Sequence, residues 1–458
     1  MLRVNKSFLL AALALAGCAH DPMAKPKGPA TPGAFSQAGA VADAKWAEAF
    51  GDSALLELIA QARKNSPDLA IARARQRESV ALLRAADAGD QPALSVAAGQ
   101  EASRISVANG RFPPGIPRRT DVTAVAAKAS WELDIWGREA AKSQAAEADV
   151  RAAKFTAAQA DLALSAEVAR LWFAVRGARE QLAFLETEFA TRLREMELVE
   201  QTVAAGLIDS DPLSSARLAA AQAKVDEGLG RRRVAAAENA LRALIGAAPG
   251  ESLPVAQGVA AMPGFGAGVP SELLLRRPDL AAAAARLDAA VSREGAARAD
   301  FYPSVTLTGQ AGWQADPASQ IGRGAAGFWS LTPAIDLPIF DAGRREANLE
   351  AARARIDGSG AEWAKAVLGA FREVEDALAD LRELALQEEL TARVLAAVRS
   401  RLANAEARQK AGLANENELT LARRDEALAA RTLSMVVWER RQVAVRLAAA
   451  TGGGWSAP

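Results

Sequence analysis

The sequence predicts a mainly α-helical fold that also contains transmembrane β-strands, with one architecture used twice along the chain. Three observations predict it. Landmark prolines and glycines recur at a nearly constant spacing, long proline-free stretches carry a helical apolar period, and short stretches alternate apolar and polar residues. Of the 458 residues, 50% are apolar and 24% are charged, which excludes global disorder.

Residues 1–17 have the form of a bacterial lipoprotein signal peptide. Arg3 and Lys6 give a basic start, and an apolar stretch over 8–16 is too short to span a bilayer. Leu-Ala-Gly-Cys follows and predicts a covalent lipid on Cys18, with no other cofactor expected. An ordinary signal peptide with an incidental cysteine is the alternative. Cys18 is the single cysteine, so an intrachain disulfide is excluded.

The mature chain divides into a lipidated N-terminus with a flexible tether over 18–45, a first repeat over 46–250, an equatorial crossover over 251–270 and a second repeat over 271–458. The tether is predicted from its prolines and glycines. The repeats are predicted from recurring landmarks. Pro67-Asp68-Leu69 recurs as Pro278-Asp279-Leu280, a shift of 211 residues, and Ala205-Gly206-Leu207 recurs as Ala411-Gly412-Leu413, a shift of 206.

Each repeat is expected to contain a helix, two strands and a long helical hairpin. The hairpin tips are predicted near 206–212 and 412–418. The 69 residues from Gly137 to Gly206 contain no proline and would form a helix about 100 Å long. Apolar residues over 182–203 step by three and four, which favours a coiled-coil seam, although a helix of a soluble bundle has the same period. In the second repeat, Gly358, Gly360 and Gly369 interrupt the long arm, where a helix can kink locally.

The strands are predicted near 92–104, 122–135, 303–315 and 326–340. Val305 and Leu307 alternate with Thr306 and Thr308, the pattern of outer-membrane strands, although a soluble hairpin with one hydrated face is the alternative. Four strands cannot close a barrel, and open edges are not tolerated in lipid. Two, three or four copies would therefore be needed, giving eight, twelve or sixteen strands, and strand count alone does not choose among them.

Four motifs give a resemblance to a known family. They are Ser130–Arg138, Pro270–Leu280, Ala297–Pro303 and Leu337–Arg344. In this order on a duplicated chain, they resemble the TolC-like outer membrane efflux proteins, in the lipid-anchored branch that serves resistance-nodulation-division (RND) pumps. The resemblance implies a homotrimer with a 12-stranded β-barrel in the outer-membrane lipid and a long periplasmic coiled-coil α-barrel.

The same resemblance implies a function. The chain would be the outer-membrane channel of a tripartite efflux system, a passive exit duct that receives transported substrate from an inner-membrane RND-type pump through a periplasmic membrane-fusion adaptor. The alternative is a non-conducting structural or adhesion protein of the cell envelope built on long helices.

The residues also exclude several chemistries. His20 is the only histidine and precedes the folded part, so a histidine-based triad or zinc site there is excluded. The chain has no GxxxxGK[ST] loop, and its formal charge of zero argues against nucleic-acid binding. An enzyme is therefore not expected.

The hairpin tips are the predicted gate and adaptor-contact sites. A glycine at each tip permits the positive φ that ends a helix. The candidate residues are Gly206, Asp209 and Asp211 at the first tip and Gly412, Glu416 and Glu418 at the second, with Arg408, Lys410 and Arg423 as cations that could hold the tips together. Solvated tip charges without a gating role are the alternative.

Overall fold

The computed structural model describes residues 24–26, 28–37, 39–104, 106, 119–255, 258 and 260–455. The predicted signal peptide and Cys18 lie outside the described residues. The chain forms two compact units. Unit 1 comprises the N-terminal residues to Gly28, Gln76–Ala153 and Ala283–Trp363, and unit 2 comprises Pro29–Arg75, Lys154–Ala282 and Ala364–Pro458.

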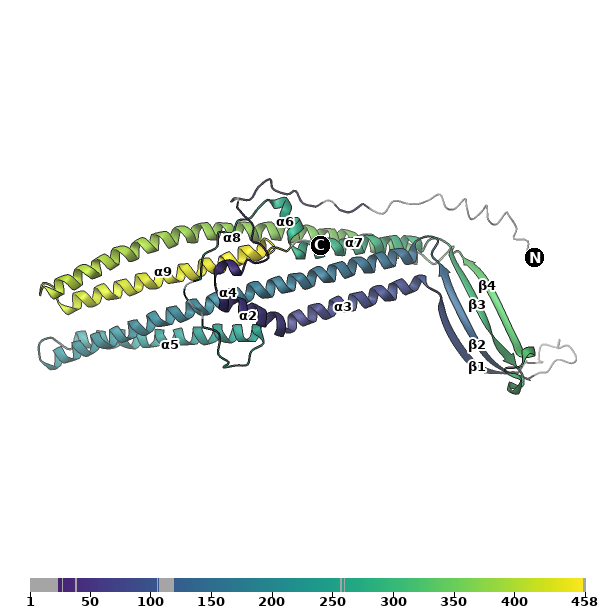
Figure 1. Ribbon diagram of the computed structural model, residues 1–458, viewed down its shortest axis with the longest axis horizontal. Helices are drawn as coiled ribbons and strands as arrows, with labels where there is room; N and C mark the ends of the chain where they lie inside the picture. The colour runs from purple at the N-terminus through teal and green to yellow at the C-terminus, as the bar shows by residue number, and fades with distance from the viewer. Residues whose placement is uncertain are drawn as a thin grey trace. The chain divides into compact units, whose positions relative to one another are not determined.

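The two halves of the chain contain the same elements in the same order, which confirms the predicted duplication (Figure 1). The first half contains α2 (Ser53–Asn65), α3 (Pro67–Asp87), β1 (Ala93–Arg104), β2 (Arg119–Leu133), α4 (Arg138–Ala204) and α5 (Asp211–Ile245). The second half contains α6 (Pro270–Arg276), α7 (Pro278–Ala299), β3 (Ser304–Ala315), β4 (Gly327–Asp336), α8 (Arg344–Lys410) and α9 (Glu416–Ala450). Short 3-10 helices span Glu48–Phe50, Ala88–Asp90, Ala318–Gln320 and Gly324–Ala326.

Unit 1 contains an antiparallel sheet in the order β1-β2-β3-β4, which confirms the four predicted strands. The register separates its two faces. Glu132 lies opposite Thr306, and Ser304 lies opposite Asp336, so these side chains share a polar face. The other face is apolar, with Trp131 opposite Leu307, Val125 opposite Trp313 and Val305 opposite Ile335. β1 and β4 form the two edges of the sheet.

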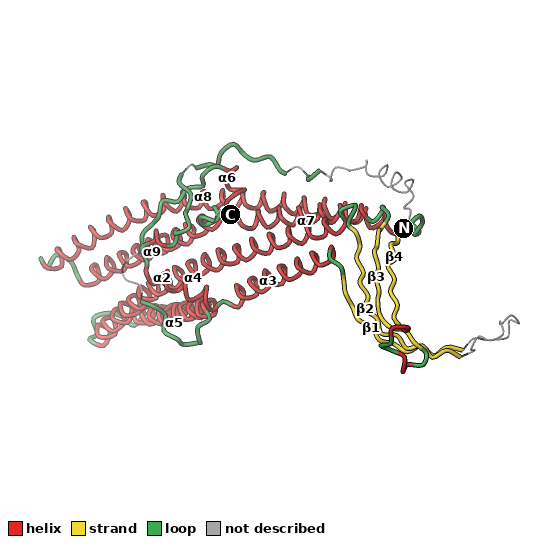
Figure 2. The backbone as a smooth tube through the Cα atoms, turned by 45° about the vertical axis from the view of Figure 1, so that its right-hand side comes forward, coloured by secondary structure: helices red, strands yellow, loops and turns green. Residues whose placement is uncertain are grey.

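Unit 2 contains two helical hairpins, α4 with α5 and α8 with α9, whose tips lie at the same end of the unit (Figures 1 and 2). Helices α4 and α8 have 67 residues each, and α5 and α9 have 35 each. α8 runs without interruption through Gly358, Gly360 and Gly369. A glycine inside a helix costs only about 0.5–1 kcal/mol, which so long a packed helix tolerates. Among the described helices, none is long and apolar enough to cross a membrane.

The core of unit 2 lies where α2 and the segment before it pack against α4, α5 and the C-terminal part of α9. Phe50, Leu55, Trp172 and Phe173 are fully buried there, together with Leu241 and Ala448. These residues come from the segment before α2, from α2, α4, α5 and α9. The hydrophobic core therefore joins segments from both repeats.

The helix predicted to open the second repeat at 271 is in fact two helices. α6 ends at Arg276, and α7 begins at Pro278. Arg277 between them is extended, with φ −102° and ψ 121°, because a residue that precedes proline is disfavoured in the α region. Its guanidinium is buried and pairs with Asp279 and Glu373 at 2.7 Å each. The break therefore presents Arg277 to α8 in unit 2.

The segment predicted as a flexible tether is partly packed. Within unit 2, the buried Phe35 ring meets Phe371 edge-on at 6.2 Å, and the Ser36 N–H donates to the Glu375 carboxylate at 2.9 Å. Within unit 1, Lys25 pairs with Asp288 at 2.5 Å. These residues pack on the helices, because their aromatic and charged side chains find partners there.

Candidate functional site

The second hairpin tip is a tight turn between α8 and α9. Gly412 adopts φ 72° and ends α8, and the Asn415 side chain caps α9 by accepting from the Glu418 N–H at 2.9 Å. Arg408 crosses the turn. Its guanidinium pairs with the Glu418 carboxylate at 2.6 Å and donates to the Leu413 carbonyl at 3.3 Å. The structure therefore brings Arg408 and Glu418 together within one chain.

The other charges at this tip divide into paired and unpaired groups. Arg423 lies 3.8 Å from Glu406 in the same hairpin. The Lys410 ammonium and the Glu416 carboxylate form no ion pair within the described residues. Arg408 and Arg423 are thus engaged by their own chain, which leaves Lys410 as the predicted gate cation that is free for another partner.

The first hairpin tip has a different charge. Gly206 adopts φ 70°, and the Leu207 N–H donates to the Thr202 carbonyl at 3.1 Å to close the turn. Asp209 and Asp211 are exposed and pair with no cation in the described part of the chain. Arg217 pairs with Glu200 at 2.7 Å and so joins α5 to α4 beyond the turn. This tip is therefore acidic.

Each tip also presents an apolar side chain to solvent. Leu207 is 74% exposed and Leu413 is 70% exposed, at equivalent positions after the two tip glycines. Within the described residues, each tip thus combines an exposed leucine with unpaired charges.

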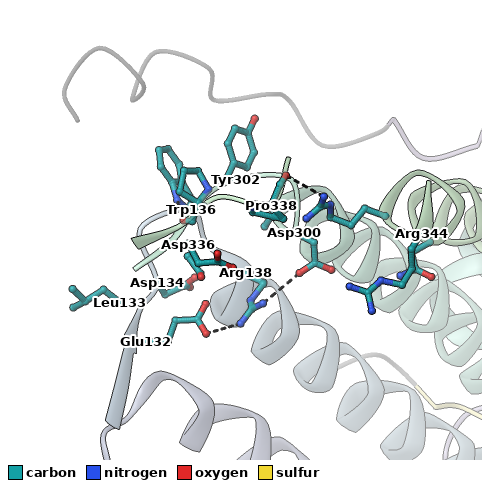
Figure 3. A pocket seen from close by; sticks show the side chains of 15 residues that line it. Glu132, Leu133, Asp134, Trp136, Arg138, Asp300, Tyr302, Asp336, Pro338 and Arg344 are labelled. Carbon is teal, nitrogen blue, oxygen red and sulfur yellow. Dashed lines mark hydrogen bonds and ion pairs between the residues drawn. The ribbon is translucent and has the colours of Figure 1, made fainter. Parts of the chain in front are cut away.

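A second site lies in unit 1, where strands end and helices begin (Figure 3). We call it the junction pocket, a cavity of about 360 Å³ whose charged lining residues are Glu132, Asp134, Arg138, Asp300, Asp336, Arg344 and Arg345. An aspartate caps each of the two long helices that begin beside the pocket. Asp134 accepts from the Ala140 N–H at 2.8 Å and Asp341 accepts from the Arg345 N–H at 3.2 Å, so each caps the first turn of a long helix.

Arg138 is the central cation of the junction pocket. Its guanidinium lies 2.7 Å from Glu132 and 3.4 Å from Asp300 (Figure 3). It also lies 3.2 Å from Glu139. Burial by itself would lower the pKa of Arg138, but the neighbouring carboxylates outweigh it and raise the pKa above its ordinary value. Arg138 therefore stays charged and ties β2, α4 and α7 together.

An aromatic pair forms another part of the lining. The rings of Trp136 and Tyr302 stack with centroids 5.0 Å apart and planes inclined by 18°. The Trp136 indole N–H donates to the Pro303 carbonyl at 2.7 Å, which fixes its ring. Within the described residues, no group of three or more His, Cys, Asp or Glu side chains is arranged to hold a metal ion.

Sequence reasoning did not identify the junction pocket as a site. Three of the four motifs quoted for the resemblance converge on it: Ser130–Arg138, Ala297–Pro303 and Leu337–Arg344. Their shared signal is charged and aromatic residues placed where a strand meets a helix. Their convergence depends on the fold, because more than 150 residues separate Arg138 from Asp300 in the chain.

The comparisons with known proteins agree along nearly the whole chain. The protein-family model described as "Outer membrane efflux protein" matches residues 58–247 and 269–453. The "Toluene efflux pump outer membrane protein TtgF" of Pseudomonas putida is 34% identical over 74% of this chain and 70% of that protein. The "Cation efflux system protein CusC" of Escherichia coli is 31% identical over 97% of both. The solved CmeC outer membrane channel of Campylobacter jejuni has a TM-score of 0.85 at 20% identity, covering 95% of this chain and 94% of that one.

Proposed function

This chain belongs to the outer membrane efflux protein family and is an outer-membrane component of an efflux system, and we propose that it forms the passive exit duct of a tripartite assembly. The observation that carries the proposal is the match of the family to both repeats, each with its pair of strands and its long hairpin. Catalysis has no part in this role, since the energy for transport would come from a pump in the inner membrane.

The sheet supports a trimeric duct. One of its faces is apolar and the other polar, and both edge strands lack a partner in one copy within the described sheet. Unpaired strand edges are not tolerated in lipid. Three copies joined through β1 and β4 would supply twelve strands, with the apolar face toward lipid and the polar face toward the channel.

The hairpin tips are the proposed surfaces for adaptor docking and for gating. Leu207 and Leu413 would contact a periplasmic adaptor of an RND-type pump, through leucines that are exposed in one copy. The acidic first tip and the free Lys410 of the second tip are complementary in charge. In the assembly, Lys410 would pair with Asp209 or Asp211 of another hairpin to keep the mouth closed. The Arg408–Glu418 pair would instead stabilise the turn of the second tip within each chain.

Cys18 supports a lipid anchor. It follows an apolar stretch and a Leu-Ala-Gly sequence, and it has no cysteine partner in the chain. Two or three acyl chains there would attach the N-terminus stably to the membrane. Mass spectrometry of the mature N-terminus should find an acylated Cys18, and an unmodified N-terminus starting elsewhere would refute the anchor.

Toxic-compound sensitivity of a deletion strain tests the duct. The relatives are named for toluene in one case and cations in another, so the proposal assigns no cargo. A strain that lacks this chain should accumulate a set of toxic compounds, and the wild-type gene should restore their export. If export is unchanged in the deletion strain while cell adhesion is lost, the structural or adhesion alternative replaces the duct.

A further inference from the structure

The junction pocket adjoins the polar face of the sheet. Glu132, Ser304 and Asp336 line the pocket, and the strand register places all three on that face. In the proposed duct this face borders the cargo path, so the pocket would open onto it. A cavity of about 360 Å³ falls within the range of sites that hold drug-sized molecules.

The charges of the pocket favour a cation. Arg138 is shared among Glu132, Glu139 and Asp300, and Lys142 pairs with Glu139 at 2.7 Å, so two positive charges face three carboxylates. Arg345 is held outside this group, by Asp341 at 3.3 Å and by the Pro338 carbonyl at 3.0 Å.

Asp336 adds a further negative charge. It is exposed and pairs with no cation in the part of the chain that the structure describes. Arg344, whose side chain is 78% exposed, lies 3.9 Å from Asp341 and faces solvent. The uncompensated charge at the polar face is therefore negative.

The aromatic pair indicates which kind of cation the pocket would bind. Trp136 is fixed by its bond to the Pro303 carbonyl, and Tyr302 stacks on it. An aromatic face beside carboxylates attracts cations through the ring quadrupole, best when the cation also has apolar surface. Metal ions are not favoured, because the carboxylates do not form a metal-binding group among the described residues.

We infer that the junction pocket is a binding site for aromatic or amphiphilic organic cations in transit through the channel. This inference rests on the proposed duct. Asp336 supplies the uncompensated charge, and the Trp136–Tyr302 pair supplies the π face. Cationic cargo would pause at the end of the sheet before it passes along the strands.

Ethidium, a fluorescent aromatic cation, tests the site on the purified full-length protein in detergent. Fluorescence titration should show saturable binding that Asp336→Asn weakens about two- to fivefold, the scale of one solvent-exposed ion pair. Glu101→Gln is the matched control, because it removes the same charge from the same polar face. Glu101 lies toward the other end of the sheet. Tyr302→Leu should weaken binding by a similar factor, whereas Tyr302→Phe should keep it.

A parallel recording separates this inference from the duct itself. In a planar bilayer, ethidium should reduce the conductance of the wild-type channel and have less effect on Asp336→Asn. A channel that conducts but binds ethidium equally well after Asp336→Asn, or that binds the anion fluorescein as tightly, overturns the site and leaves the duct intact. Absence of conductance in the wild-type protein contradicts the duct.

Discussion

Asp52 shows how single side chains hold unit 2 together. Its buried carboxylate accepts from the Leu55 N–H at 3.2 Å, so it caps α2, and from the Trp172 indole N–H at 2.8 Å. It also pairs with Arg176 at 2.8 Å. One carboxylate thus links α2 to α4 inside the core. A buried charge of this kind is stable only when all its partners are present.

Asp52→Ala should therefore destabilise the protein strongly. Removal of one partner of a buried ion pair costs about 3–5 kcal/mol, because Arg176 and the Trp172 N–H lose their acceptor. Thermal unfolding followed by circular dichroism should show a clear fall in the midpoint. Asp376→Ala is the control, since Asp376 is 68% exposed and should change stability by less than about 0.5 kcal/mol. Equal midpoints for the two variants would show that Asp52 contributes little.

Charge reversal tests the contact proposed for the tips. Lys410→Glu would replace attraction to Asp209 and Asp211 by repulsion, so single-channel conductance should rise. The wild-type conductance should return when Asp209→Lys and Asp211→Lys are added to Lys410→Glu, because the charges of the two tips are then complementary again. Arg393→Glu is a control of the same charge change on α8, where Arg393 pairs with its neighbour Glu389. The contact is refuted if Lys410→Glu and the control conduct alike.

At the scale of whole elements, the sequence predicted the strands and long helices because their periodicities are strong. The predicted strand over 326–340 ends instead at Asp336, since its partner strand begins at Ser304 after Pro303, which has no N–H to extend the ladder. The predicted strand over 122–135 begins earlier, at Arg119, because it pairs with Arg104. These ends depend on the partner strand, which periodicity does not reveal.

The candidate sites were predictable to different degrees. The tip glycines mark the turns, and they lie where the helices end. Which cation meets which acid was not predictable, because Arg408 and Glu418 are ten residues apart and meet only once the turn has formed. The junction pocket was not predicted, because its walls come from distant segments of the chain.

Glycines of α8 provide a prediction at the element scale. A Cβ added at Gly358 meets nothing within 4 Å, so Gly358→Ala should stabilise by about 0.5–1 kcal/mol. A Cβ added at Gly360 would lie 2.6 Å from the Pro26 ring, so Gly360→Ala should displace the N-terminal segment. Thermal unfolding and limited proteolysis near Pro26 measure both effects. If Gly360→Ala leaves proteolysis unchanged, the segment does not pack on α8.

At the scale of the whole molecule, the unpaired sheet edges predict an oligomer, and the family resemblance implies three copies. Native mass spectrometry of the detergent-purified protein should give three copies. Amide hydrogen exchange should protect β1 and β4 as strongly as β2 and β3, since a partner copy covers each edge. A stable monomer that retains its full β content would count against the trimer, because its edges would lie unpaired in lipid.

The central claim is that this chain forms a duct, and conductance across a planar lipid bilayer tests it most directly. Purified wild-type protein should insert and give discrete single-channel steps, with larger steps for Lys410→Glu if the tips form the closed mouth. The polar face of the sheet predicts current that follows the applied voltage passively. The account would be contradicted if both the wild-type protein and Lys410→Glu insert as trimers and pass no ions.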